Sequence, residues 1–205
     1  MSHTTPSASI FTRILLLPLL LFALMAAAAH AADDDEALIL VARPQLNADA
    51  MYGSTILLAK PMRDGSSIGF IINKPTPVTL GELFPDHQPS LKVTESVFLG
   101  GPVGTNMIVA LVARHESPGS GSIQLAPDLF LAVNAQTVDR IIENDPEHAR
   151  FFAGVVVWRP GELEEELKRG FWYEMEADTA LVFRKQTVGL WEELAQKSAI
   201  SRDGI

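Results

Sequence analysis

The 205-residue sequence contains no cysteine, and this absence narrows the chemistry open to the chain. Without thiols it can form no disulfide, build no thiolate metal site and use no cysteine nucleophile. Basic residues are also scarce, because 16 Lys and Arg stand against 25 Asp and Glu, for a formal net charge of −9. Phosphate contacts depend on Lys and Arg, so we expect no direct binding of nucleic acid.

The first 31 residues have the three parts of a secretory signal, which are a positive charge, an apolar run and a cleavage site of small residues. Arg13 supplies the charge, residues 14–28 are apolar, and Ala29-His30-Ala31 follows them. The run is short for a membrane helix, which needs about 20 residues, and Pro18 interrupts it. We predict cleavage after residue 31 and a periplasmic product that begins with a disordered acidic arm, residues 32–36.

Two other interpretations of this segment stay open. The apolar run could remain uncleaved as an anchor. Alternatively, translation could start at Met25, which would remove Arg13 and leave a cytoplasmic protein. If the segment is cleaved, we expect no stable membrane span.

The rest of the chain is long enough to form one globular domain, and 47% of the whole sequence is hydrophobic. We expect this domain to cover residues 37–200 and to be followed by a frayed end at 201–205. Apolar, β-branched runs predict strands, and 3.6-residue periodicity predicts a few short helices. Strands are expected at 37–42, 54–60, 68–74, 97–101, 107–113, 123–133 (interrupted by Pro127), 153–161 and 171–177, and helices at 79–84, from 137, at 162–170 and at 190–199. Without a βαβ rhythm, this order indicates an α+β fold.

Local signals refine several of these elements. Asp64-Gly65 predicts a hairpin turn, because both residues tolerate positive φ. Pro75 and Pro77 should end the second strand of that hairpin, since proline cannot donate to a ladder. Thr79 followed by Glu82 is typical of a capping box, and Thr137 is the expected N-cap of the helix after it.

Motifs of catalysis and ligand binding are incomplete. Gly100-Gly101-Pro102 lies between two strands and lacks the Lys of a Walker loop and the helix of a dinucleotide fold, which favours a structural turn. "GSSIG" (65–69) matches a nucleophile elbow, but a strand follows its serine where a helix is required. The five histidines show no metal-ligand spacing. We therefore expect no catalytic residue, metal or cofactor.

Two charged stretches near the C-terminus have simple structural explanations. Glu164, Glu165 and Glu166 are consecutive on a helix and are expected to form its solvated face. Residues 193–205 look like the first part of a helix-turn-helix, but the chain stops before a recognition helix could form. A terminal helix that packs Trp191 and Leu194 on the core is the preferred interpretation.

Several segments together resemble the YqgE/AlgH family. They are "LVARPQLNADAMYGSTILLA" (40–59), "GSSIGFIINKPTPVTLGELF" (65–84) with the pattern G-x-x-x-N-K-P, "VFLGGPV" (97–103), and "AGVVVWRPGELEEELKRGFW" (153–172) with the pattern W-x-P-G-x-L-E-x-E-L. The resemblance implies an α+β fold in which coiled, mostly antiparallel sheets form a pseudo-barrel with a few short helices. It implies no known cofactor and no agreed catalytic residue.

Members of this family are usually labelled transcriptional regulators, and they look cytoplasmic, in contrast to the export-like segment here. We expect a non-enzymatic binding or regulatory domain with an unknown protein or small-molecule partner. The candidate surface is formed by Asn73, Lys74, Pro75, Gly100, Gly101, Pro102 and Trp158. The alternative is a small-molecule-binding protein or an undiscovered enzyme that uses the Asn73-Lys74 and Gly100-Gly101 loops.

Overall fold

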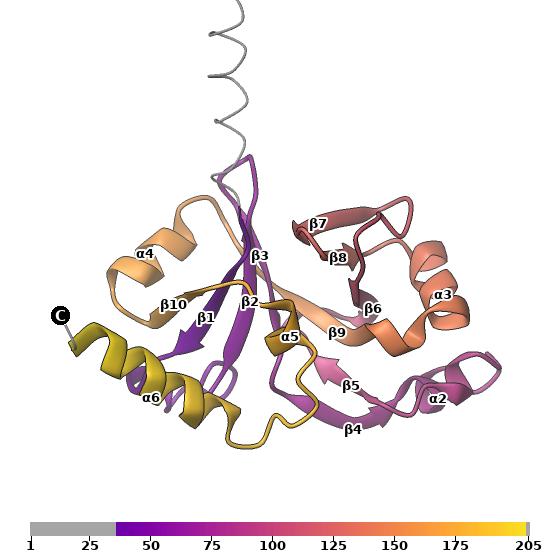
Figure 1. Ribbon diagram of the computed structural model, residues 1–205, viewed down its shortest axis with the longest axis horizontal. Coiled ribbons are helices and arrows are strands. Elements are labelled where there is room, and N and C mark those ends of the chain that lie inside the picture. Colours follow the sequence, from indigo (N-terminus) through magenta and orange to yellow (C-terminus); the bar gives the residue numbers. More distant parts are fainter. Residues whose placement is uncertain (1–35, 204–205) are drawn as a thin grey trace, which may run out of the picture. The chain divides into compact units, whose positions relative to one another are not determined.

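The computed structural model describes residues 36–203, which belong to one compact unit (Figure 1). The predicted export signal and nearly all of the acidic arm lie outside the described residues. Within residues 36–203, no helix is long and apolar enough to cross a membrane.

The core of the fold is a ten-stranded sheet. Its strands are β1 (Leu38–Ala42), β2 (Ile56–Pro61), β3 (Ser67–Ile71), β4 (Pro75–Thr79), β5 (Ser96–Leu99), β6 (Val103–Ala113), β7 (Ser122–Ala126), β8 (Leu129–Ala132), β9 (Ala149–Trp158) and β10 (Trp172–Glu176). The main order is β10-β1-β2-β3-β9-β6-β8-β7, while β4 pairs with β5 and β5 pairs with β9.

The sheet is curled into a half-barrel, as Figure 1 shows, and the expected α+β fold is confirmed. Every pairing is antiparallel except the one between β5 and β9. The long strand β9 joins the two halves, because its first part pairs with β6 and its end pairs with β3. The Asp64-Gly65 hairpin between β2 and β3 is also confirmed, with Gly65 at a φ of +79°.

Short helices cover the ends of this sheet. They are α2 (Leu80–Leu83), α3 (Ala135–Asn144), α4 (Glu162–Lys168), α5 (Thr179–Val182) and α6 (Leu190–Asp203). In Figure 1, α4 and α6 lie beside β10 and β1, whereas α2 and α3 lie at the other end, near β5 and β6. The predicted capping box of α2 is confirmed, because the Thr79 amide donates to Glu82 Oε2 at 2.7 Å and Thr79 Oγ1 accepts from the Glu82 amide.

The structure extends one sequence prediction and corrects another. The strand β3 does end before the prolines, but Pro75 itself begins a further strand, β4. Because β4 pairs only with β5 among the described residues, proline is tolerated at this edge. The helix α3 begins before Thr137, since Asn134 is the N-cap and its side chain accepts from the Thr137 amide. At the C-terminal end of the described residues, α6 extends to Asp203.

The terminal helix α6 packs on the core as predicted. It is one continuous helix without the turn of a helix-turn-helix. Leu194 is buried, and the Trp191 indole donates to the Ala42 carbonyl at 2.8 Å. These contacts hold α6 against β1.

Candidate functional site

The Gly100-Gly101-Pro102 turn carries the chain over strand β9. Phe152 of β9 pairs with Phe98 of β5 on one edge and with Val109 of β6 on the other. The chain therefore crosses β9 between β5 and β6. This crossing leaves no room for side chains: a Cβ on Gly100 would lie 2.1 Å from the Gly154 carbonyl oxygen, and one on Gly101 would lie 2.2 Å from Val155 C.

The backbone groups of this turn are engaged inside the fold. The Gly100 amide donates to the Ala153 carbonyl at 2.9 Å, and the Gly100 carbonyl accepts from the Ile71 amide at 2.9 Å. Both glycines are buried, whereas Pro102 is exposed. The turn is therefore an element of architecture, and its buried position does not suit a phosphate-binding loop.

Asn73 and Lys74 hold the loop that precedes β2. Asn73 Oδ1 accepts from the Ile56 amide, and Asn73 Nδ2 donates to the Ser54 carbonyl, both at 2.9 Å. The Lys74 ammonium donates to the Met51 carbonyl at 2.7 Å. Burial lowers the pKa of Lys74, and the nearby carboxylate of Asp49 partly offsets this effect. The polar groups of both side chains are thus occupied by the chain itself.

Trp158 lies in the interior, with 4% of its surface exposed. Its indole donates to Glu166 Oε2 at 3.1 Å, and the indole of Trp172 donates to the same oxygen at 2.8 Å. The prediction that Glu164, Glu165 and Glu166 all form a solvated face is therefore wrong for Glu166. Glu166 lies two residues before the end of α4 and accepts from tryptophans on β9 and β10, the strands that precede and follow α4 in the chain.

The structure thus brings together only part of the predicted surface. The Leu99 amide donates to the Lys74 carbonyl at 2.9 Å, so residues 73–75 run beside the start of the glycine turn. Trp158 packs in a separate cluster with Leu163 and Trp172. Among residues 36–203, no group of three or more His, Asp or Glu is placed to hold a metal ion.

A groove that the sequence did not predict lies between α2, β6 and α3. Two adjoining cavities of about 300 and 340 Å³ form it, and they share Phe84, Asn106 and Ile108. The register of β6 against β9 shifts between Val103 and Ile108, so residues 104–107 bulge outward. This bulge forms one wall of the groove, and α3 forms another.

Large apolar side chains are exposed along this groove. Leu83, Phe84, Met107 and Val133 have 43%, 42%, 53% and 45% of their surface accessible to solvent. They are four of the nine large hydrophobic residues that are exposed in the described part of the chain. Scattered exposed apolar residues need no explanation, but a contiguous group around a groove is typical of an interaction site.

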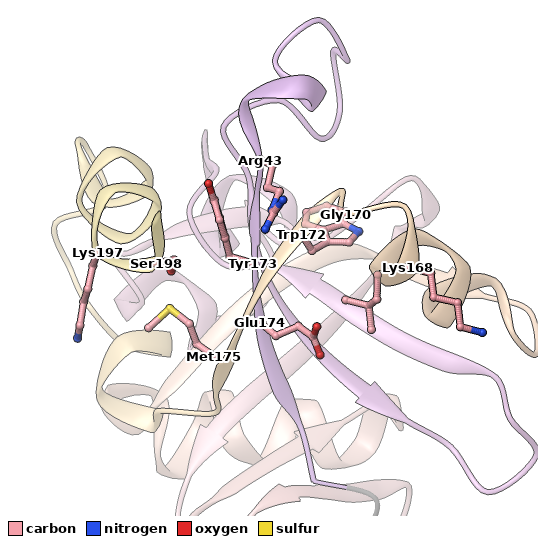
Figure 2. A pocket seen from close by; sticks show the side chains of 10 residues that line it. Arg43, Lys168, Gly170, Trp172, Tyr173, Glu174, Met175, Lys197 and Ser198 are labelled. Carbon is pink, nitrogen blue, oxygen red and sulfur yellow. The ribbon is translucent and has the colours of Figure 1, made fainter. Parts of the chain in front are cut away.

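A second cleft, of about 490 Å³, follows strand β10 between α4 and α6 (Figure 2). Arg43, which comes directly after β1, extends into it and lies over the Tyr173 ring, with its guanidinium carbon 4.3 Å from the ring centre. Lys168 lines the cleft from α4 and Lys197 from α6, and Glu174 is the one carboxylate on its wall. The cleft is polar, in contrast to the groove at the other end of the sheet.

Comparisons with known proteins agree on one family. A family model described as AlgH-like matches residues 39–202 of this chain. The UPF0301 protein of Myxococcus xanthus is 31% identical over 157 residues, which are 75% of this chain and 85% of that relative. The UPF0301 protein of Streptomyces coelicolor is 31% identical over 166 residues, which are 78% of this chain and 84% of that relative.

Two solved structures share the fold. The crystal structure of a protein from Corynebacterium diphtheriae aligns with a TM-score of 0.65 at 19% identity, over 80% of this chain and 87% of that one. The solution structure of the AlgH protein from Pseudomonas aeruginosa aligns with a TM-score of 0.63 at 24% identity, over 83% of this chain and 88% of that one.

Proposed function

This chain belongs to the AlgH-like family, and we propose that it is a non-enzymatic domain that binds another protein. The relatives are uncharacterised, so the proposal is based on the surface of this chain. The family membership confirms the resemblance inferred from sequence motifs. The observation that carries the proposal is the exposed apolar groove between α2, β6 and α3.

The groove suits an apolar segment of a protein partner. Leu83, Phe84 and Met107 border it and are about half exposed, so a partner that covers them removes apolar surface from water. Interfaces of this kind depend on a few large apolar anchors surrounded by polar groups. Asn106 and Asp139 supply polar groups in the lining.

The proposal excludes direct recognition of DNA. The formal net charge of −9 opposes phosphate contacts, and α6 is a single helix against the core. A gel-shift assay with genomic fragments at about 150 mM salt should show no retention, since salt governs such binding. Tight, sequence-selective retention would contradict this part of the proposal.

The alternative, a small-molecule site at the Asn73-Lys74 and Gly100-Gly101 loops, has less support. The Lys74 ammonium and the Gly100 amide both donate to backbone carbonyls of the same chain. A thermal-shift screen with nucleotides and metabolites tests this alternative, because a ligand of the native state raises its melting temperature. A reproducible shift that Lys74→Ala abolishes would favour the alternative.

Site-specific photocrosslinking in the source cell tests the protein-binding proposal. A photoreactive phenylalanine analogue at position 84 or 107 should give one discrete adduct with another protein. The same analogue at position 188 is the matched control, because Val188 is also apolar and exposed, at 83%, but lies outside the groove. Adducts of equal yield at all three positions would contradict a specific groove.

The partner identified in that adduct is then titrated with the purified chain. Phe84→Ala should weaken binding about 30-fold, the effect of removing an anchor worth about 2 kcal/mol. Val188→Ala should leave the affinity unchanged. Equal affinities for the two variants would place the interface elsewhere.

A further inference from the structure

Strand β10 has a free edge. In the described part of the chain, β10 pairs only with β1, and it ends the sheet. The Arg43 amide donates to the Phe171 carbonyl at 2.9 Å, and the two residues continue the register of the ladder. Because hydrogen-bonded and non-bonded pairs alternate in an antiparallel ladder, the amide and carbonyl groups of Trp172 and Glu174 point away from β1.

This edge lies in the cleft of Figure 2. The end of α4 stands on one side of β10 and α6 stands on the other, and the cavity of about 490 Å³ runs between them. Its lining includes four consecutive residues of β10, Trp172 to Met175, so both faces of the strand border the cavity. The outward backbone groups of β10 therefore border a channel with two walls, in which Glu174 is exposed and Trp172 is 4% exposed.

The charge of this channel is opposite to that of the whole chain. Among the described residues, Arg43, Lys168 and Lys197 line it together with one carboxylate, that of Glu174, whereas the chain carries a formal net charge of −9. The Arg43 guanidinium has a ring contact with Tyr173, and its Nε is buried without a hydrogen-bond partner. A donor in this state is suited to an added acceptor.

From these observations we propose that the cleft binds an extended, acidic segment of a partner protein, which adds to β10 as an eleventh strand. Its backbone pairs with the outward groups of Trp172 and Glu174, and its carboxylates lie near Arg43 and the two lysines. Strand addition of this kind takes its affinity from main-chain hydrogen bonds and its specificity from side chains at the rim. The surface is separate from the apolar groove and stands independently of it.

A second copy of this chain is a poorer occupant. Pairing of β10 with β10 of another copy would bring rows of Glu174 and Glu176 close together, and like charges opposite each other destabilise a sheet. A small carboxylate is also a poorer occupant, because it would leave the row of backbone donors and acceptors unused. Both occupants give distinct results in the experiment below.

The test begins with a library of random 12-residue peptides displayed on phage and selected on the full chain. We expect enrichment of sequences rich in Asp and Glu. The most enriched peptide, made synthetically, should shift the backbone amide signals of residues 172–176 in the ¹⁵N-labelled chain. No enrichment, enrichment of neutral or basic peptides, or shifts confined to other strands would overturn the proposal.

Two variants separate strand addition from simple charge attraction. Glu174→Pro removes an outward amide without removing a hydrogen bond to β1, and proline is tolerated at such an edge position. Glu174→Pro should lower the affinity for the peptide at least tenfold, whereas the matched variant Glu174→Gln should not lower it. Lys168→Glu should lower the affinity for the peptide severalfold, and Phe84→Ala in the apolar groove should leave this affinity unchanged.

Other results of the same titration overturn the proposal. Equal binding by Glu174→Pro and Glu174→Gln would show that no strand is added. Acetate or free glutamate that displaces the peptide at millimolar concentration would show an anion site only. Signals of residues 172–176 that change on dilution of the chain alone would show that a second copy occupies the edge.

Discussion

Among single residues, Glu166 links the pattern W-x-P-G-x-L-E-x-E-L to strand β10 through hydrogen bonds. One carboxylate oxygen accepts from Trp158 at the start of the pattern and from Trp172 on β10. Glu166→Ala would leave two buried indole donors without a partner. We expect the free energy of unfolding to fall by about 3 kcal/mol.

Denaturant unfolding followed by tryptophan fluorescence measures this effect. Glu165→Ala is the matched control on the same helix, because Glu165 is exposed and its pair with Arg169 lies on the surface. That variant should change the stability by less than about 1 kcal/mol. Equal losses for the two variants would mean that the carboxylate of Glu166 does not hold the tryptophans.

His148 offers a pH-dependent contact. Its Nδ1 lies 2.6 Å from the Asp145 carboxylate, and this hydrogen bond, with the charge of Asp145, raises the pKa of His148. The protonated ring is therefore favoured in the folded chain. The stabilisation is fully present below the pKa of the unfolded state, about 6.5, and it is lost as the pH rises through the higher folded pKa.

An NMR titration of the His148 ring proton should accordingly have its midpoint above about 6.5. In Asp145→Asn the midpoint should move down, because the negative charge and the carboxylate acceptor are removed together. An unchanged midpoint in that variant would contradict the assignment.

At the level of elements, the crossing over β9 leaves no room for a side chain on the chain that passes over it. A Cβ on Gly101 would meet the carbonyl carbon and oxygen of Val155 at 2.2 and 2.4 Å, and neither is a flexible side chain. Gly101→Ala should therefore separate β5 and β6 from β9 and lower the free energy of unfolding by about 3 kcal/mol or more.

The neighbouring residue supplies the control for this change. Pro102→Ala alters the same turn at an exposed position and should cost within about 1 kcal/mol. Thermal unfolding followed by circular dichroism compares the two variants. If Gly101→Ala had the same melting temperature as Pro102→Ala, the backbone at the crossing could accommodate a Cβ atom.

At the scale of the whole molecule, Arg150 joins parts of the chain that are far apart in sequence. Its side chain is 1% exposed, and it donates from β9 to the carbonyls of Val182 and Arg184 and to the carboxylate of Glu95. Its guanidinium also lies 4.3 Å from the ring centre of Phe98. One cation thus attaches the C-terminal segment to the middle of the sheet.

Arg150→Met should leave those carbonyls without donors and lower the free energy of unfolding by about 2 to 4 kcal/mol. Hydrogen exchange of residues 178–190 should become faster, because the segment loses its attachment. Arg169→Gln, a change at an exposed arginine, is the control and should alter neither property. Unchanged exchange in Arg150→Met would contradict the role of this residue.

The N-terminal segment carries a prediction about the whole protein. With Arg13, the apolar run and Ala29-His30-Ala31, we expect export and a mature periplasmic protein that begins at Ala32. Cell fractionation followed by N-terminal sequencing checks both points. A cytosolic protein that starts at Met25, or one in the membrane fraction that keeps Arg13, would contradict cleavage.

The features that depend only on neighbouring residues could be predicted before the fold was known. The Asp64-Gly65 hairpin and the Thr79–Glu82 capping box were predictable, because each needs only the conformations and side chains of a few consecutive residues. The family signature was readable for the same reason, as a set of short patterns in a fixed order. The terminal helix was also predicted from the sequence, and it is present as α6.

The roles of those patterns depend on contacts that form only in the folded chain. Gly101 is required because β9, more than 50 residues later, passes beneath it, and the Glu166 carboxylate is engaged because β10 brings the Trp172 indole to it. The apolar groove and the edge of β10 were not predictable either, since each is built from elements that meet only once the strand order is set. Strand pairing over long separations depends on the packing of the whole sheet, and no local pattern encodes it.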